Sequence, residues 1–84
     1  AIVLGSKLYL ADSSNSRILV WNNIPTSNTQ GADSVIGQTS LFSANLNTVS
    51  LSSSTLNNPF ALSSQDIYLI IADRDNNRVL FIVP

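Results

Sequence analysis

Apolar residues crowd both sides of a short polar segment near the start of the chain. The stretch LYLADSSNSRILVW, residues 8–21, contains two apolar runs joined by DSSNSR. Neither run alternates between apolar and polar residues, as the strands of a hairpin with one wet face do. We therefore expect two antiparallel strands buried on both faces and joined by the four-residue loop 13–16, a common hairpin length.

The same pattern returns once further along the chain. LIIADRDNNRVLFI, residues 69–82, aligns without a gap to residues 8–21 at an offset of 61, with six identities in fourteen positions. That many identities indicate an internal repeat, the usual signature of repeat architectures. The polar residues common to both copies are Asp12, Asn15 and Arg17, and Asp73, Asn76 and Arg78.

The repeated polar residues are typical of turn chemistry. Asn15 and Asn76 are expected to adopt the left-handed conformation, and each Asp to accept hydrogen bonds from backbone amides of its loop. Each Asp also flanks the loop opposite an Arg, so the two can pair across the strands. A catalytic or ligand-binding role is the alternative, but a structural role is favoured because the pattern occurs twice.

The remaining chain predicts further strands and one long connection. The strands are expected at about 1–4, 7–11, 17–22 and 33–37, then 59–63, 66–72 and 77–83, with the next strand beyond Pro84. Between them, residues 38–58 are rich in Ser and Asn but carry apolar anchors, so this loop is expected to pack with its own side chains.

Four-stranded antiparallel units in tandem, with both faces apolar, predict an all-β fold of the β-propeller type, whose blades stack face against face. The first blade is expected at about 1–37 and the second, lacking its outer strand, at about 59–84. Propellers close with typically 4–8 blades. Two blades cannot close, so we expect further blades from the same longer chain or, as the less favoured alternative, from other copies.

Four stretches of the sequence resemble the NHL-repeat β-propellers, and the long-blade bacterial type above all. They are KLYLADSSNSRILVWNNIPTSN, DSVIGQ, NNPFAL and IADRDNNRVLFI. The resemblance implies that the Asp-x-x-Asn-x-Arg hairpins are the signature of the repeat. Two departures are visible: residues 1–4 lack the Pro found at Pro59, and IYLIIAD is longer than LYLAD, which predicts a bulge near Ile67–Ile70.

Charge and composition exclude several classes of function. The net charge is −1 and the four basic residues are scattered, which argues against nucleic acid, including the RNA bound by some relatives of the family. His, Cys and Glu are absent, so the usual transition-metal ligands and neutral-pH bases are missing. Asp73 and Asp75 could at most hold Ca²⁺ weakly. We therefore expect no catalytic, cofactor or metal site and, without an apolar run of ~20 residues, no membrane insertion.

The expected function is a non-catalytic scaffold that binds protein or glycan through its loops. Trp21 and Phe42 are candidate contacts, although Trp21 ends an apolar strand and is more readily explained by packing. The uncharged Ser/Asn-rich composition is typical of an extracellular or cell-surface protein. Two alternatives remain: a segment of a propeller lyase or hydrolase whose active site lies elsewhere, and a structural component that decorates an extracellular assembly.

Overall fold

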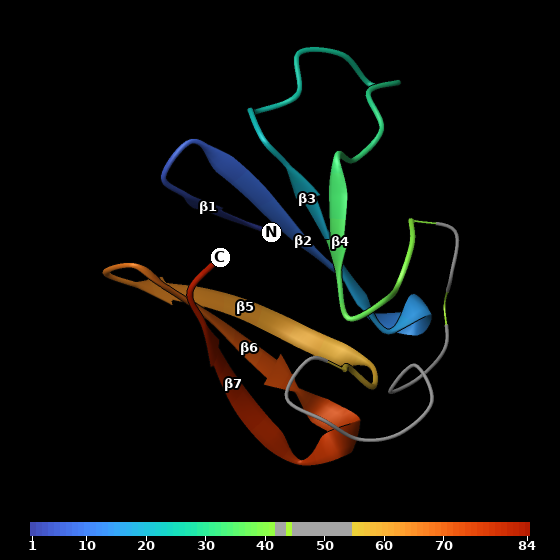
Figure 1. Cartoon of the computed structure of the whole chain (residues 1–84), viewed down its shortest axis with the longest axis vertical. Coiled ribbons are helices and arrows are strands. Elements are labelled where there is room, and N and C mark those ends of the chain that lie inside the picture. Colours follow the sequence, from blue (N-terminus) through green and yellow to red (C-terminus); the bar gives the residue numbers. More distant parts are fainter. Residues whose placement is uncertain (42–43, 45–54) are drawn as a thin grey trace.

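The chain folds into two antiparallel β-sheets, of four and three strands (Figure 1). A computed structural model describes residues 1–41, 44 and 55–84. The first sheet has the order β1-β2-β3-β4 and the second β5-β6-β7. The strands are β1 (Ile2–Leu4), β2 (Lys7–Asp12), β3 (Arg17–Trp21), β4 (Ser34–Ile36), β5 (Pro59–Gln65), β6 (Tyr68–Asp73) and β7 (Arg78–Ile82). The all-β prediction is confirmed: the sheets are blade-like and do not close into a ring.

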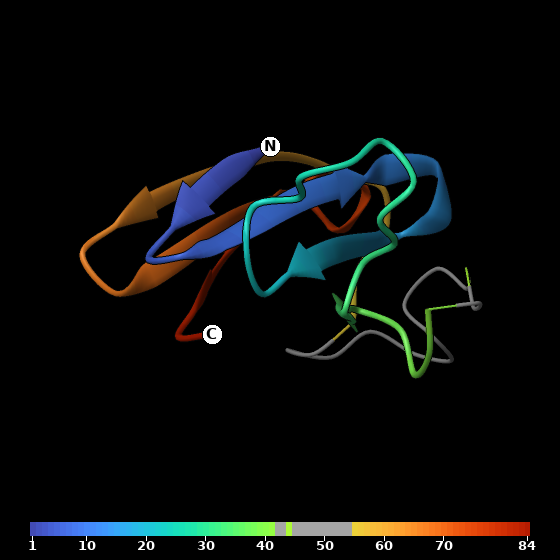
Figure 2. The same cartoon turned by 90° about the horizontal axis from the view of Figure 1, so that it is seen from above.

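The two sheets pack against each other through one face each. Figures 1 and 2 show them as neighbouring layers, and β5 lies against both β1 and β2. Because side chains alternate along a strand, every second residue faces the other sheet. We call this the inner face of each sheet and the opposite side its outer face.

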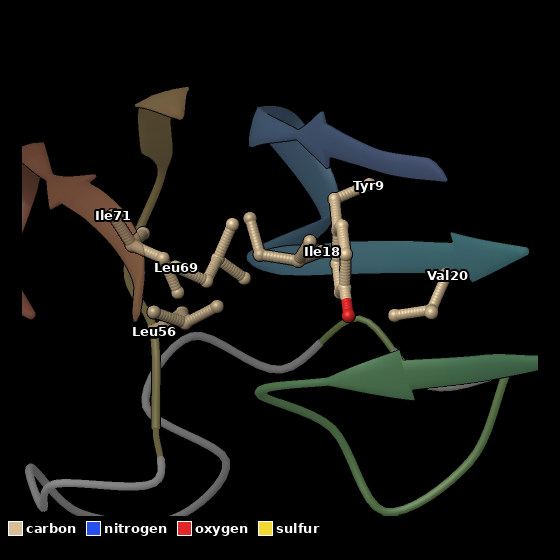
Figure 3. Packing of buried hydrophobic residues seen from close by; sticks show 6 residues of the cluster. All are labelled: Tyr9, Ile18, Val20, Leu56, Leu69 and Ile71. Carbon is tan, nitrogen blue, oxygen red and sulfur yellow. The ribbon is translucent and has the colours of Figure 1, made fainter. Parts of the chain in front are cut away.

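A small apolar core fills the space between the inner faces (Figure 3). The first sheet contributes Tyr9, Ile18 and Val20, and the second contributes Leu69 and Ile71. Burying an apolar side chain of this size contributes roughly 1.5–3 kcal/mol. The contact between the sheets is therefore a main source of stability for this chain.

One member of the core comes from outside the sheets. Leu56 precedes β5 and is 1% exposed, and it lies beside Leu69 at one end of the cluster (Figure 3). The expectation that residues 38–58 supply apolar anchors is confirmed for Leu56. Of the other apolar anchors of this loop, Leu41 is described and half-buried. The rest lie outside the described residues, namely Phe42, Leu46, Val49 and Leu51.

The predicted bulge is in a different strand from the one expected. The register between β5 and β6 shifts between Pro59 and Ala61, so the extra residue is Phe60. The bulge predicted near Ile67–Ile70 is absent: Ile67 lies in the turn before β6 and is exposed, and the register of β6 with β5 is regular from Tyr68 to Ala72. The additional apolar residue of IYLIIAD therefore belongs to the hairpin turn, and β6 has the same length as β2.

Within the described ranges, no helix has the length and apolar character that crossing a lipid bilayer requires.

Candidate functional site

The two repeated hairpins have the same loop structure. After Asp12, residues Ser13–Asn15 form one 3-10 turn, η1, and Ser16 takes the left-handed conformation with φ 53° before β3 begins. The Ser16 amide closes the turn by donating to the Ser13 carbonyl at 3.0 Å. The four-residue loop is as predicted, but the left-handed residue is Ser16 and not Asn15.

The second loop repeats this geometry at the offset of 61. Residues Arg74–Asn76 form η2, and Asn77 is left-handed with φ 54°. The Asn77 amide donates to the Arg74 carbonyl at 3.0 Å. The prediction that Asn76 is left-handed is therefore wrong as well, because in both loops the repeated Asn ends the 3-10 turn and its side chain donates to the Asp instead.

In the first hairpin, the side chains of the signature residues bind one another. Asp12 Oδ2 accepts from Asn15 Nδ2 at 3.0 Å and from Arg17 Nε at 2.7 Å. Burial by itself raises the pKa of Asp12, but the hydrogen bonds from Asn15 and Arg17 and the charge of Arg17 outweigh it, and the pKa lies below its ordinary value. The expected bonds from amides of the same loop do not form at Asp12.

The second hairpin has the same network, built around a buried carboxylate. Asp73 Oδ2 accepts from Asn76 Nδ2 at 2.7 Å and from Arg78 Nε at 2.9 Å. Its other oxygen, Oδ1, accepts the backbone amide of Asn57 at 2.8 Å, so the amide that Asp73 binds comes from outside the loop. The Asp73 side chain has no exposed surface, whereas that of Asp12 is 24% exposed.

Residues 55–59 connect the two hairpin loops, which the sequence analysis did not foresee. On the first loop, Ser13 Oγ donates to the Pro59 carbonyl at 2.5 Å and Ser16 Oγ accepts the Asn58 amide at 3.3 Å. On the second loop, the Asp75 amide donates to the Asn57 carbonyl at 3.1 Å. This segment is thus bonded to both sheets at once.

The two arginines also hold the long connection from opposite sides. Arg17 Nη1 donates to the Leu41 carbonyl, and Arg78 Nη2 donates to the Thr55 carbonyl at 2.6 Å. Each guanidinium therefore joins its own carboxylate to the backbone of the connection. Two N–H groups of one planar guanidinium are thus engaged by two different partners, which fixes geometry in addition to pairing charge.

Gly37 and Gln38 complete the contacts around the first loop. Gln38 Nε2 donates to the Ser16 carbonyl at 2.9 Å. Gly37 has φ +95°, and a Cβ placed on it would lie 2.6 Å from Leu56 Cδ1. The Gly-Gln pair at the end of β4 is therefore needed for the close approach of Leu56 and for satisfying the loop carbonyls.

The candidate contact Trp21 is used to fasten a loop. Its Nε1 donates to the Gln30 carbonyl at 3.0 Å, and at the base of the same loop the Asn22 amide donates to Asp33 Oδ2 at 2.8 Å. Trp21 is half-buried on the outer face of the first sheet. Phe42, the other candidate contact, lies outside the described residues.

The acidic pair considered for Ca²⁺ is already engaged by nitrogen donors. Both oxygens of Asp73 accept hydrogen bonds, and Asp75 lies beside Arg74, with Nε and Oδ1 at 3.5 Å, and accepts from Asn58. Among the described residues, no three acidic side chains gather as a group that could hold a metal ion.

A shallow groove of about 450 Å³ lies at the opposite end of the sheets from the signature loops. It opens between the turns that precede β2 and β6, where Lys7 and Asp66 bring opposite charges. Tyr9 also lines the groove, and burial raises the pKa of its phenol. The lining residues are Leu4, Gly5, Ser6, Lys7, Tyr9, Asp66, Ile67, Val83 and Pro84.

Comparison with known proteins gave no match: the chain matches no family model, no curated protein and no solved structure. Its chemistry must therefore be read from its own residues. The signature side chains form hydrogen bonds within the fold, and the surfaces left for partners are the loops and the outer faces of the sheets.

Proposed function

We propose that this chain is a non-catalytic scaffold of the NHL-like propeller type, exported from the cell, whose sheets hold loops that bind protein or glycan. The observation that carries the proposal is the use of both Asp-Asn-Arg sets in holding the backbone. Asp73, the most buried acid of the chain, accepts three hydrogen bonds from nitrogen donors. A carboxylate whose two oxygens are both engaged, on a side chain with no exposed surface, serves structure and is not accessible to a substrate.

The loop at residues 22–33 is the best candidate for the binding surface. It is anchored at its base by Trp21 and Asp33. Thr26 is held from within, because its amide donates to Gln30 Oε1 at 3.3 Å. A loop held in this way on a sheet scaffold loses little entropy when it binds a partner. Its exposed residues include Ile24, an apolar side chain with polar neighbours, as in many carbohydrate and protein contacts.

The proposal is tested by screening the full chain on a glycan array and against extracellular matrix proteins by surface plasmon resonance. The variant Ile24→Ser, combined with Asn28→Ala, is expected to weaken any interaction found by at least tenfold. Both residues are exposed, so the fold should be unaffected.

The matched control is Ser14→Ala, an exposed substitution in the loop at the other end of the first sheet. This variant should bind as the wild type does. Binding that is lost equally in both variants would contradict a role for loop 22–33, and a chain without any glycan or protein ligand would contradict the proposed function itself.

A further inference from the structure

The repeat and the packing of the sheets show that the residue positions facing inward in the first unit face outward in the second. The inner face of the first sheet carries Tyr9, Ala11, Ile18 and Val20. Moved by the repeat offset of 61, these positions become Ile70, Ala72, Val79 and Phe81. That second set lies on the outer face of the second sheet, because its members alternate with the buried Leu69 and Ile71.

The same relation holds in the other direction. The inner face of the second sheet carries Leu69, Ile71, Leu80 and Ile82. The positions 61 residues earlier are Leu8, Leu10, Leu19 and Trp21, on the outer face of the first sheet. We call the face that carries Tyr9 or its equivalents the front of a unit, and the face that carries Leu69 or its equivalents the back. The contact inside the chain therefore joins the front of one unit to the back of the next.

The two outer faces are thus the missing halves of a contact that the chain already makes once. The outer face of the second sheet is a front on which no back is packed in the described part of the chain. The outer face of the first sheet is likewise a back on which no front is packed. Both faces are apolar. On the second sheet Phe81 is 65% exposed and Val79 57%, and on the first sheet Leu10 is 38% exposed while Leu8, Leu19 and Trp21 are half-buried. Open apolar faces of this kind mark sites of association.

We propose that these faces bind each other between copies of this chain, so that the outer face of the second sheet of one copy covers the outer face of the first sheet of the next. The contact is head-to-tail, since a front fits a back. Head-to-tail contacts generate closed rings when the rotation between copies completes a circle. The partner is a second copy of the chain. This inference depends on the fold of the two sheets and not on the binding of a protein or glycan.

The experiment uses one substitution on each face and a mixture of the two variants. Leu10→Lys places a charge on the outer face of the first sheet, and Phe81→Lys places one on the outer face of the second. Masses are measured by sedimentation velocity and by light scattering at about 5–200 µM protein, a range that covers dissociation constants in the micromolar range. Circular dichroism and thermal melts confirm that both variants remain folded.

The wild type is expected to have a mass that is a multiple of the 9.0 kDa chain. Each variant alone is expected to lose association and to have the mass of one chain. An equal mixture should form a dimer and no larger species, because each variant retains one functional face. The control Ile67→Lys, in a turn and 62% exposed, should assemble as the wild type does.

Three outcomes would overturn the proposal: a folded wild type that is monomeric at every concentration, a single variant that still dimerises, or a mixture that stays monomeric. The first would mean that the faces are covered by other sheets, such as those of a longer chain. The second would mean that copies associate through identical faces. None of the three outcomes bears on loop 22–33, whose ligand binding is measured separately.

Discussion

Asp73 and Arg78 face each other across the β6–β7 hairpin, with Arg78 Nε 2.9 Å from Asp73 Oδ2. Their counterparts Asp12 and Arg17 make the same bond at 2.7 Å in the first hairpin. The two pairs differ in what covers them. The Asp73 pair lies on an inner face against the other sheet, and the Asp12 pair lies on an outer face.

The first prediction compares the two carboxylates directly. Asp73→Asn should destabilise the chain by about 3 kcal/mol, because it leaves Arg78 without its charged partner and weakens three hydrogen bonds of a side chain that has no exposed surface. Asp12→Asn should cost only about 1 kcal/mol, since its pair is partly solvated. Urea denaturation of the two variants checks this order. Equal losses would mean that the complete burial of the Asp73 side chain does not matter.

The second prediction concerns acid. The folded state lowers the pKa of Asp12 below its unfolded value, so the ionised carboxylate stabilises the fold. This contribution is complete above the ordinary Asp pKa and is lost as the pH falls through the lower pKa of the folded state. The stability difference between wild type and Asp12→Asn, measured by urea denaturation, should therefore shrink from pH 6 towards pH 2. A difference that stays constant over this range would contradict the prediction.

The third prediction uses two glycines with positive φ. Gly37→Ala should destabilise the chain by about 2–3 kcal/mol, because the new Cβ would overlap Leu56 and the backbone conformation disfavours any side chain. Gly5→Ala should cost about 1 kcal/mol, since φ is +64° but no atom lies within 4 Å of the new Cβ. Thermal unfolding separates the steric part of the cost from the backbone part.

The fourth prediction concerns the anchor of loop 22–33. Trp21→Phe removes the hydrogen bond to the Gln30 carbonyl while keeping an aromatic ring on the sheet. The loss in global stability should be small, about 0.5–1 kcal/mol, because the bond is exposed. Amide exchange of Thr26 should accelerate, since its acceptor is the Gln30 side chain. Unchanged exchange at Thr26 would mean that the loop is held without Trp21.

The strands and the hairpin loops could be predicted from the sequence because their determinants are local. The apolar runs on both sides of Ser13–Ser16 define β2 and β3, and the offset of 61 transfers this result to β6 and β7. The pairing of Asp with Arg also follows locally, because the two residues flank a four-residue loop. These features need only the spacing of residues within one hairpin.

The errors arose where several conformations satisfy the same local pattern. Asn is the usual residue for a left-handed position, yet Ser16 takes it, because the left-handed residue is the one that follows the 3-10 turn and Asn15 is the last residue of that turn. The register irregularity of the second unit could be placed in β5, in the turn or in β6. Its position at Phe60 depends on Pro59 being buried and paired with Asp73, which spacing alone does not reveal.

The contacts of residues 55–59 depend on the fold as a whole. Asn57 reaches Asp73 and Asn58 reaches Ser16 only after the two sheets have come together. A weak signal was present, since Asn-Asn directly before Pro59 is typical of a turn whose polar groups need partners. No local rule names those partners, because they lie 16 and 42 residues away.

The front-to-back stacking of the sheets also bears on how such a chain can evolve. Side chains on the two broad sides of a unit have to match a neighbour of the same kind and nothing else. An in-frame duplication of 61 residues therefore creates a unit whose sides already fit those beside it. Genes of this type can lengthen by whole units, without any new set of core residues having to arise.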